Sequence, residues 1–135
     1  MTEYTATVVE YFSQHYGSDF VVFQIFFEDF DPEKGGQSWS FQRALGADGT
    51  VESLSEEDEG VCIVKEIQQI VAYEEIDRFI LERTRVACHF SDTFSQREGI
   101  DKLLIHLNIS NAQWNELVSM ARTVFRGREY FNVEM

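Results

Sequence analysis

The sequence has little proline, little cysteine, few cations and no long hydrophobic run. Its 135 residues include one Pro, two Cys and eight Gly, and 11 Lys and Arg stand against 24 Asp and Glu. So little Pro and Gly excludes a collagen-like or low-complexity chain, and two cysteines are too few for a disulfide scaffold. The longest apolar stretch, residues 20–27, is far shorter than the roughly 18 residues of a membrane helix. We therefore expect a single domain over residues 1–135 with no membrane span.

The scarcity of Lys and Arg gives a formal net charge of −13. Phosphate binding requires clustered cations, so this balance disfavours nucleic acid and anionic membrane surfaces as partners. It favours a basic protein partner, whose arrival the negative field would accelerate, although solubility alone would explain the charge as well. The first twelve residues alternate and include Glu3, unlike a secretory leader. We expect a cytoplasmic protein whose cysteines, Cys62 and Cys88, are free and behave as small apolar residues.

Alternating apolar residues predict strands along most of the chain. The segments rich in β-branched and aromatic residues, with turn-forming residues between them, are 3–12, 20–30, 38–45, 61–71 and 102–109. Residues 73–90 fit either a helix or a hairpin that turns at Arg83 and Thr84. The alternation of Val86, Cys88 and Phe90 favours the hairpin.

One amphipathic helix is predicted over residues 110–127. Its apolar stripe at helical spacing is Trp114, Leu117, Val118, Ala121, Val124 and Phe125. Ser110 and Gln113 form a capping-box pattern at its start, and Gly127 suits a left-handed stop at its end. Together these elements predict an α+β fold: a twisted, mostly antiparallel sheet of six to eight strands, open or sandwich-like, packed by the C-terminal helix.

The sequence contains no strong catalytic or metal-binding motif. Neither HExxH nor CxxC occurs, and adjacent Cys88 and His89 would point to opposite faces of a strand. The stretch DFDPEKG starts like a calcium loop, but its glycine, Gly35, is seventh instead of sixth, and Ser40 stands where the twelfth-position glutamate belongs. We therefore expect no cofactor, no metal and no catalytic residues, so the protein is not predicted to be an enzyme.

A dense run of carboxylates is the most distinctive feature. The candidate partner-binding residues are Asp48, Glu52, Glu56, Glu57, Asp58 and Glu59, with Asp29, Asp31 and Glu33 as a second group. Exposed like charges cost little because salt screens them within about 8 to 10 Å, so a solvated loop is one interpretation. The other is a rim that pairs with Arg and Lys, since charge-assisted hydrogen bonds are the stronger ones.

The order of these features resembles family ten of the immunity proteins of bacterial polymorphic toxin systems. The similarity covers residues 38 to about 125 and includes Gln42 and Arg43 at a strand end, the acids Glu56 to Glu59, and then Glu66 and Gln69. The resemblance implies a protein that neutralises a cognate toxin by binding it, without chemistry. Gln42, Arg43 and Glu66 are equally expected as structural polar residues that tie the sheet together.

Two further alternatives remain open from the sequence. Twelve Phe residues would be able to line a cavity between sheet and helix, which would make the chain a carrier of small apolar ligands. An unpaired edge strand would allow a homodimer. The first hypothesis is nevertheless an acidic inhibitor of a basic toxin domain. A nuclease is one candidate for this domain, because it binds phosphate with cations.

Overall fold

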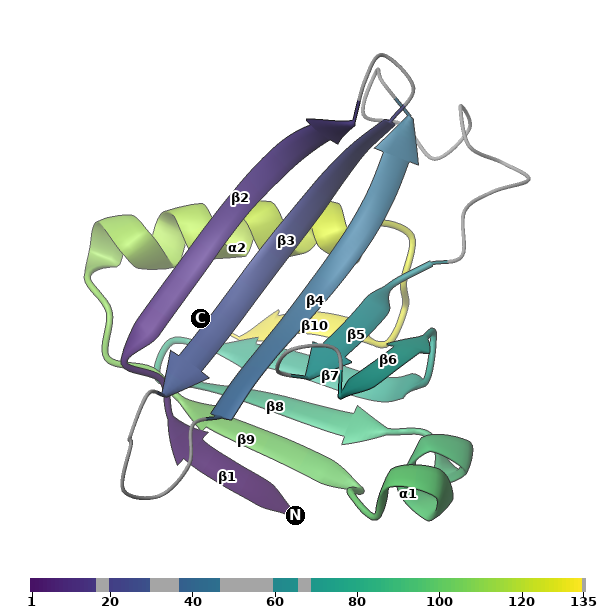
Figure 1. Cartoon of the computed structure of the whole chain (residues 1–135). Helices are drawn as coiled ribbons and strands as arrows, with labels where there is room; N and C mark the ends of the chain where they lie inside the picture. The colour runs from purple at the N-terminus through teal and green to yellow at the C-terminus, as the bar shows by residue number, and fades with distance from the viewer. Residues whose placement is uncertain (17–19, 30–36, 47–59, 66–68, 135) are drawn as a thin grey trace.

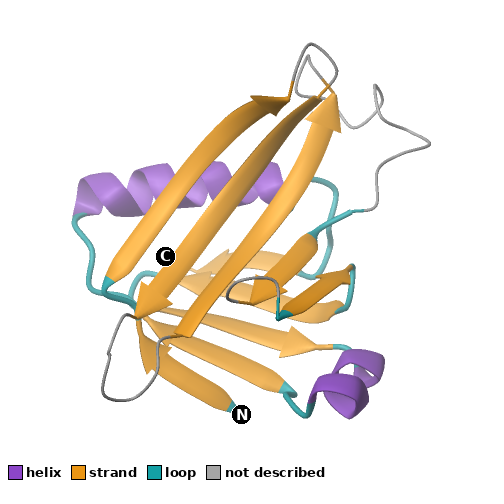
Figure 2. Cartoon of the chain, in the orientation of Figure 1, coloured by secondary structure: helices purple, strands orange, loops and turns teal. Residues whose placement is uncertain are grey.

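A computed structural model describes residues 1–16, 20–29, 37–46, 60–65 and 69–134. Its elements in chain order are β1 (Thr2–Thr5), β2 (Val8–Tyr16), β3 (Phe20–Asp29), β4 (Gln37–Gly46), β5 (Cys62–Lys65), β6 (Ile70–Tyr73), β7 (Ile76–Glu82), β8 (Arg85–Phe90), α1 (Asp92–Glu98), β9 (Lys102–His106), α2 (Asn111–Val124) and β10 (Phe131–Glu134). The strands form two five-stranded sheets: sheet A, in the order β1-β9-β8-β7-β10, and sheet B, in the order β2-β3-β4-β5-β6 (Figures 1 and 2). The predicted α+β class is confirmed.

The described chain has ten strands in two sheets, whereas the sequence predicted a sheet of six to eight strands, open or sandwich-like. The first expected strand breaks after Thr5, so β1 joins sheet A while β2 joins sheet B. The segment expected as one strand over 61–71 divides into β5 and β6, and β10 was not predicted. Strands β1, β6 and β10 have four residues each, which is too short for a two-residue alternation to stand out. Two of them, β1 and β10, pair in parallel with β9 and β7.

Sheet B is an antiparallel meander whose side chains alternate between two faces. Ile25, Phe27, Trp39 and Phe41 are fully buried on its inner face. Helix α2 packs on this face and crosses behind β2, β3 and β4 (Figure 1). A helix with one apolar stripe buries that stripe against a sheet, which is why the chain places α2 here.

Helix α2 begins at the predicted cap, Ser110, and ends at Val124, three residues before the predicted stop, Gly127. The Ser110 hydroxyl accepts from the Gln113 N–H, and the Gln113 side chain accepts from the Ser110 N–H, so the capping box is present. The five stripe residues within the helix are buried. Gly127 lies two residues beyond the C-cap residue Phe125 and adopts φ 78°, the left-handed conformation that glycine tolerates best.

Two of the sequence alternatives, for residues 73–90 and for the cysteines, are also resolved. Residues 76–90 form the predicted hairpin, in which β7 and β8 are paired up to Glu82 and Arg85. Cys62 and Cys88 are buried thiols that form no disulfide, as predicted, and burial raises the pKa of the Cys88 thiol well above its usual value. The short helix α1 was not predicted, although the Ser91 hydroxyl caps it by accepting from the Phe94 N–H.

Aromatic rings join the two sheets to the end of α2. The Phe79 ring of sheet A lies 4.9 Å from Phe41 of sheet B and 4.3 Å from Phe125, measured between centroids. Phe131 of β10 stacks on Phe125 at 4.8 Å. Most of the buried apolar residues form one cluster that includes both sheets and α2, so the fold has a single main core.

Candidate protein-binding face

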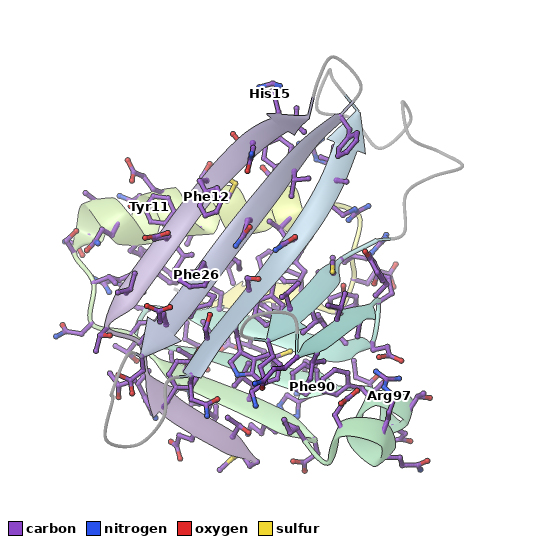
Figure 3. The ribbon with its side chains drawn as sticks, in the orientation of Figure 1. Tyr11, Phe12, His15, Phe26, Phe90 and Arg97 are labelled. Atoms are coloured by element: carbon purple, nitrogen blue, oxygen red, sulfur yellow. The ribbon has the colours of Figure 1, made fainter. Side chains whose placement is uncertain are left out.

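One face of sheet B is left uncovered by the described helices and strands. We call it the outer face; its described members are Val8, Glu10, Phe12, Gln14, Phe20, Val22, Gln24, Phe26, Glu28, Ser38, Ser40, Gln42, Ala44, Cys62, Val64, Val71 and Tyr73. These side chains point away from α2 because the strand pleat alternates and the inner face already holds the helix. In Figure 1 no described element lies in front of β2, β3 and β4, and Figure 3 shows Phe12 and Phe26 on this side.

The outer face carries most of the large apolar side chains that the described chain leaves in water. Four such residues are exposed, and three of them belong to this face: Phe12 is 40%, Val71 48% and Tyr73 47% exposed. Burying such a side chain is worth about 1.5–3 kcal/mol, so each gains if a partner covers it. Exposed apolar residues gathered on one face, with polar residues around them, are typical of a protein-binding surface.

The cross-strand register arranges part of the outer face into one row. Phe12, Gln24, Gln42, Cys62 and Tyr73 are successive partners across all five strands. An exposed aromatic ring therefore stands at each end, with two amides and a buried thiol between. Neighbouring strands are about 4.8 Å apart, so the row spans about 19 Å, which suits a protein epitope better than a small molecule.

The charges of the outer face have one sign. Its described members include Glu10 and Glu28 and contain no Lys or Arg. The outward side of sheet A differs, because Arg78, His89 and Lys102 are neighbours on β7, β8 and β9. Burial together with the charges of Lys102 and Arg78 lowers the pKa of His89. The two outward surfaces therefore differ, because the described part of the outer face of sheet B carries no Lys or Arg.

Glu74 fixes the point at which the chain enters β5. Its Oε1 accepts from the Val61 N–H at 2.8 Å and from Arg128 Nε, and its Oε2 accepts from the Tyr130 hydroxyl at 3.0 Å. Glu74 itself adopts φ 54°, an uncommon conformation for a residue with a Cβ. Burial and the nearby Glu74 charge raise the pKa of Tyr130. One carboxylate thus ties the start of β5 to the segment that leads into β10.

The neighbouring carboxylate, Glu75, is paired with Arg97 of α1. The two guanidinium Nη atoms of Arg97 donate to the two Glu75 oxygens, and its Nε donates to Glu98. This bidentate contact lowers the pKa of Glu75. Glu74 and Glu75 are therefore both engaged within the fold, and neither is offered to a partner.

The structure places only some of the predicted site residues. Asp29 ends β3 and is half-buried. The predicted residues Asp31, Glu33, Asp48, Glu52, Glu56, Glu57, Asp58, Glu59 and Glu66 lie outside the described residues. Gln42 is on the outer face, where its Nε2 donates to the Ser40 hydroxyl at 3.3 Å. Arg43 is on the opposite, inner face, and its Nη1 donates to the carbonyls of Val124 and Arg126.

The histidines and cysteines of the described residues do not converge. Among those residues, no group of three or more His, Cys, Asp or Glu side chains is placed to hold a metal ion. His106 Nε2 lies 2.7 Å from a Glu3 oxygen at the surface, while Cys88 is fully buried. Between sheet B and α2, Ile25, Leu117 and Ala121 are fully buried within the main core. These side chains fill the space between the sheet and the helix at their positions.

Sequence reasoning missed the exposed residues Val71 and Tyr73. They occur in IVAYEE, where apolar residues occupy both strand parities, so the pattern predicts burial on both faces. Their exposure follows from the position of β6, which is the last strand of sheet B and has four residues. A short edge strand with apolar residues on both faces exposes one set unless another element covers it.

Comparison of this chain with protein-family models, with curated proteins and with solved structures finds no match. Within the described residues, no helix has the length and apolar character to span a membrane.

Proposed function

We propose that this chain is a non-catalytic, acidic binding protein that neutralises a basic toxin domain by covering it. The observation that carries the proposal is the outer face of sheet B, which combines exposed Phe12, Val71 and Tyr73 with no described cation. Aromatic residues supply the anchors at protein interfaces, and charge complementarity supplies the rate and the choice of partner.

Three further features support the proposal. The net charge is −13, which would accelerate the approach of a cationic domain. The carboxylates of residues 47–59 are attached to sheet B at both ends, since β4 precedes them and β5 follows. The resemblance of residues 38 to about 125 to immunity protein family ten points to the same role, with the protein acting in the cytoplasm of the cell that it protects.

The test is co-expression with the product of the gene directly upstream of this one. Expressed alone in a bacterial host, that product is expected to arrest growth, and co-expression of this chain is expected to restore growth. The two purified proteins should form a complex whose affinity falls as salt rises. A harmless upstream product, or a toxic one that this chain neither binds nor suppresses, would contradict the proposal.

Truncation of the β6 anchors tests the outer face. The double substitution Val71→Ala and Tyr73→Ala should weaken the complex by at least about 30-fold, because even one anchor residue at an interface is worth about 2 kcal/mol or more. Isothermal titration calorimetry gives the dissociation constant. The matched control is Asn132→Ala, an exposed β10 residue on the outward side of sheet A, which should leave binding unchanged; equal effects of the two variants would remove the outer face from the interface.

Charge reversal tests the acidic segment. Replacing Glu56, Glu57, Asp58 and Glu59 with Lys changes the net charge from −13 to −5, because each reversal adds two units. Association should slow by about tenfold or more at low salt and lose most of its salt dependence, since steering depends on the summed charge. Stopped-flow measurements over a range of salt concentrations report both quantities, and unchanged kinetics would exclude the segment from steering.

A further inference from the structure

Strand β2 is a long edge strand with one side unpaired in the described chain. It pairs with β3 through nine consecutive partners, from Val8 with Glu28 to Tyr16 with Phe20. Because β2 is the first strand in the order of sheet B, no described strand pairs with its other side. Figure 1 shows β2 at the margin of the sheet. Such an edge presents a row of backbone N–H and C=O groups to solvent, which is a template for another strand.

The usual protections of an edge strand are absent from β2. Proteins discourage edge pairing with lysine, proline, short strands or bulges. Residues 8–16, VVEYFSQHY, contain neither Lys nor Pro, and the register with β3 runs without interruption. The inner side of the strand is in contact with α2. The edge is therefore long and regular.

The sequence of β2 is complementary to itself. Its central residue is Phe12, so antiparallel pairing of two copies about a two-fold axis would place Phe12 opposite Phe12 of the second copy. Glu10 would then face Gln14, and Tyr11 would face Ser13. Glu10, the only carboxylate of the strand, thus faces an amide that can donate a hydrogen bond, and two Glu10 side chains do not meet.

We propose that two copies of this chain pair through β2 about Phe12, which joins their B sheets into one ten-stranded sheet. Phe12 is 40% exposed, and this pairing covers its ring with an identical ring. A surface depression lined by Val9, Glu10, Tyr11 and Phe12 marks the same place; residues of both parities line it, so it lies at the strand edge. The outer faces of the two copies become one continuous surface.

The overall charge sets the conditions under which the dimer forms. Each copy carries a net charge of −13, so the two copies repel one another at long range. Salt screens this repulsion within about 8 Å at physiological strength. The dimer fraction should therefore rise with salt, whereas the complex with a basic partner weakens. The inference is independent of the proposed function, and this opposite response separates the two.

Cysteine crosslinking tests the register. Phe12→Cys places two sulfurs opposite each other, with Cβ atoms about 5 Å apart, whereas two copies of Gln14→Cys are offset by four residues, about 13 Å, beyond the reach of a disulfide. In oxidised glutathione, Phe12→Cys should crosslink at least about tenfold faster than Gln14→Cys. The native cysteines do not interfere, because Cys62 and Cys88 are buried.

A second experiment keeps the Phe12 ring. A mixture of Glu10→Cys and Gln14→Cys chains should crosslink between the two variants, while each variant alone should not. Light scattering of the unaltered protein at high concentration should give a mass that moves from 15.7 kDa toward twice that value as salt rises. Equal crosslinking rates for Phe12→Cys and Gln14→Cys, or a monomer mass at every salt concentration, would overturn the proposal.

Discussion

Replacing Gly60 with alanine is expected to lower the free energy of unfolding by about 4 kcal/mol. Gly60 adopts φ +84°, a conformation that costs a residue with a Cβ about 1 kcal/mol or more. Gly60 is also buried, and an added Cβ would lie 2.1 Å from Glu74 Oε1 and 2.3 Å from its Cγ. The Glu74 side chain therefore has to move.

The displacement of Glu74 accounts for most of the expected loss. This carboxylate accepts hydrogen bonds from the Val61 N–H, from Arg128 Nε and from the Tyr130 hydroxyl. A hydrogen bond to a charged group contributes about 1.5–3 kcal/mol, and a donor left buried without an acceptor costs a similar amount. The start of β5 and the segment before β10 would both lose their common anchor.

Gly99 provides the matched control for this substitution. It adopts φ +73°, close to that of Gly60, but no atom lies within 4 Å of a Cβ added there. Gly99→Ala should therefore cost only the backbone strain, about 1 kcal/mol. Urea unfolding followed by circular dichroism gives both free energies. If the two substitutions cost the same, Glu74 does not hold Val61 in the way described.

The sequence predicted the elements with the longest patterns. Helix α2 has a stripe of five apolar residues, which Phe125 at the C-cap continues, together with a complete capping box, so periodicity and end signals agree. The hairpin of β7 and β8 was favoured for a similar reason, since Val86, Cys88 and Phe90 alternate over a whole strand. In both cases a local signal coincides with the face that the fold buries.

The sequence does not predict which sheet each strand joins, because this depends on partners that are distant along the chain. Nothing local indicates that Thr5 and Val8 belong to different sheets, yet β1 pairs with β9 about a hundred residues away. The same applies to Glu74, whose partners Arg128 and Tyr130 lie more than fifty positions along the chain. Its φ of 54° is imposed by those contacts, because glutamate has no local preference for that conformation.

The candidate site likewise has one part that the sequence predicts and another part that depends on the fold. Composition alone predicted an acidic surface and a basic partner, since net charge requires no knowledge of the fold. The aromatic part of the site, with Phe12 and Tyr73 at opposite ends of one row, depends on the register of five strands. Of the predicted acidic residues, Asp29 ends β3 in the same sheet, but it is five residues from Gln24 and has the opposite strand parity.

Substituting Arg43 with alanine is expected to destabilise the fold by about 3–5 kcal/mol. Arg43 is only 1% exposed, and its Nη1 lies 3.3 Å from the Val124 carbonyl and 3.1 Å from the Arg126 carbonyl. These carbonyls belong to the end of α2, where the helix dipole is negative and the last C=O groups have no intrahelical partner. Alanine would leave them without this donor and would open a cavity in the core.

Arg122 separates this role of Arg43 from a general effect of removing a cation near the helix end. It lies in the last turn of α2 and is exposed, so Arg122→Ala should change stability by no more than about 0.5 kcal/mol. Arg43→Lys should fall between the two, because a single ammonium keeps the charge but lacks the planar guanidinium fork. Thermal and urea unfolding rank the three variants by their loss of stability. If Arg43→Ala is as mild as Arg122→Ala, Arg43 of β4 does not hold the end of the helix.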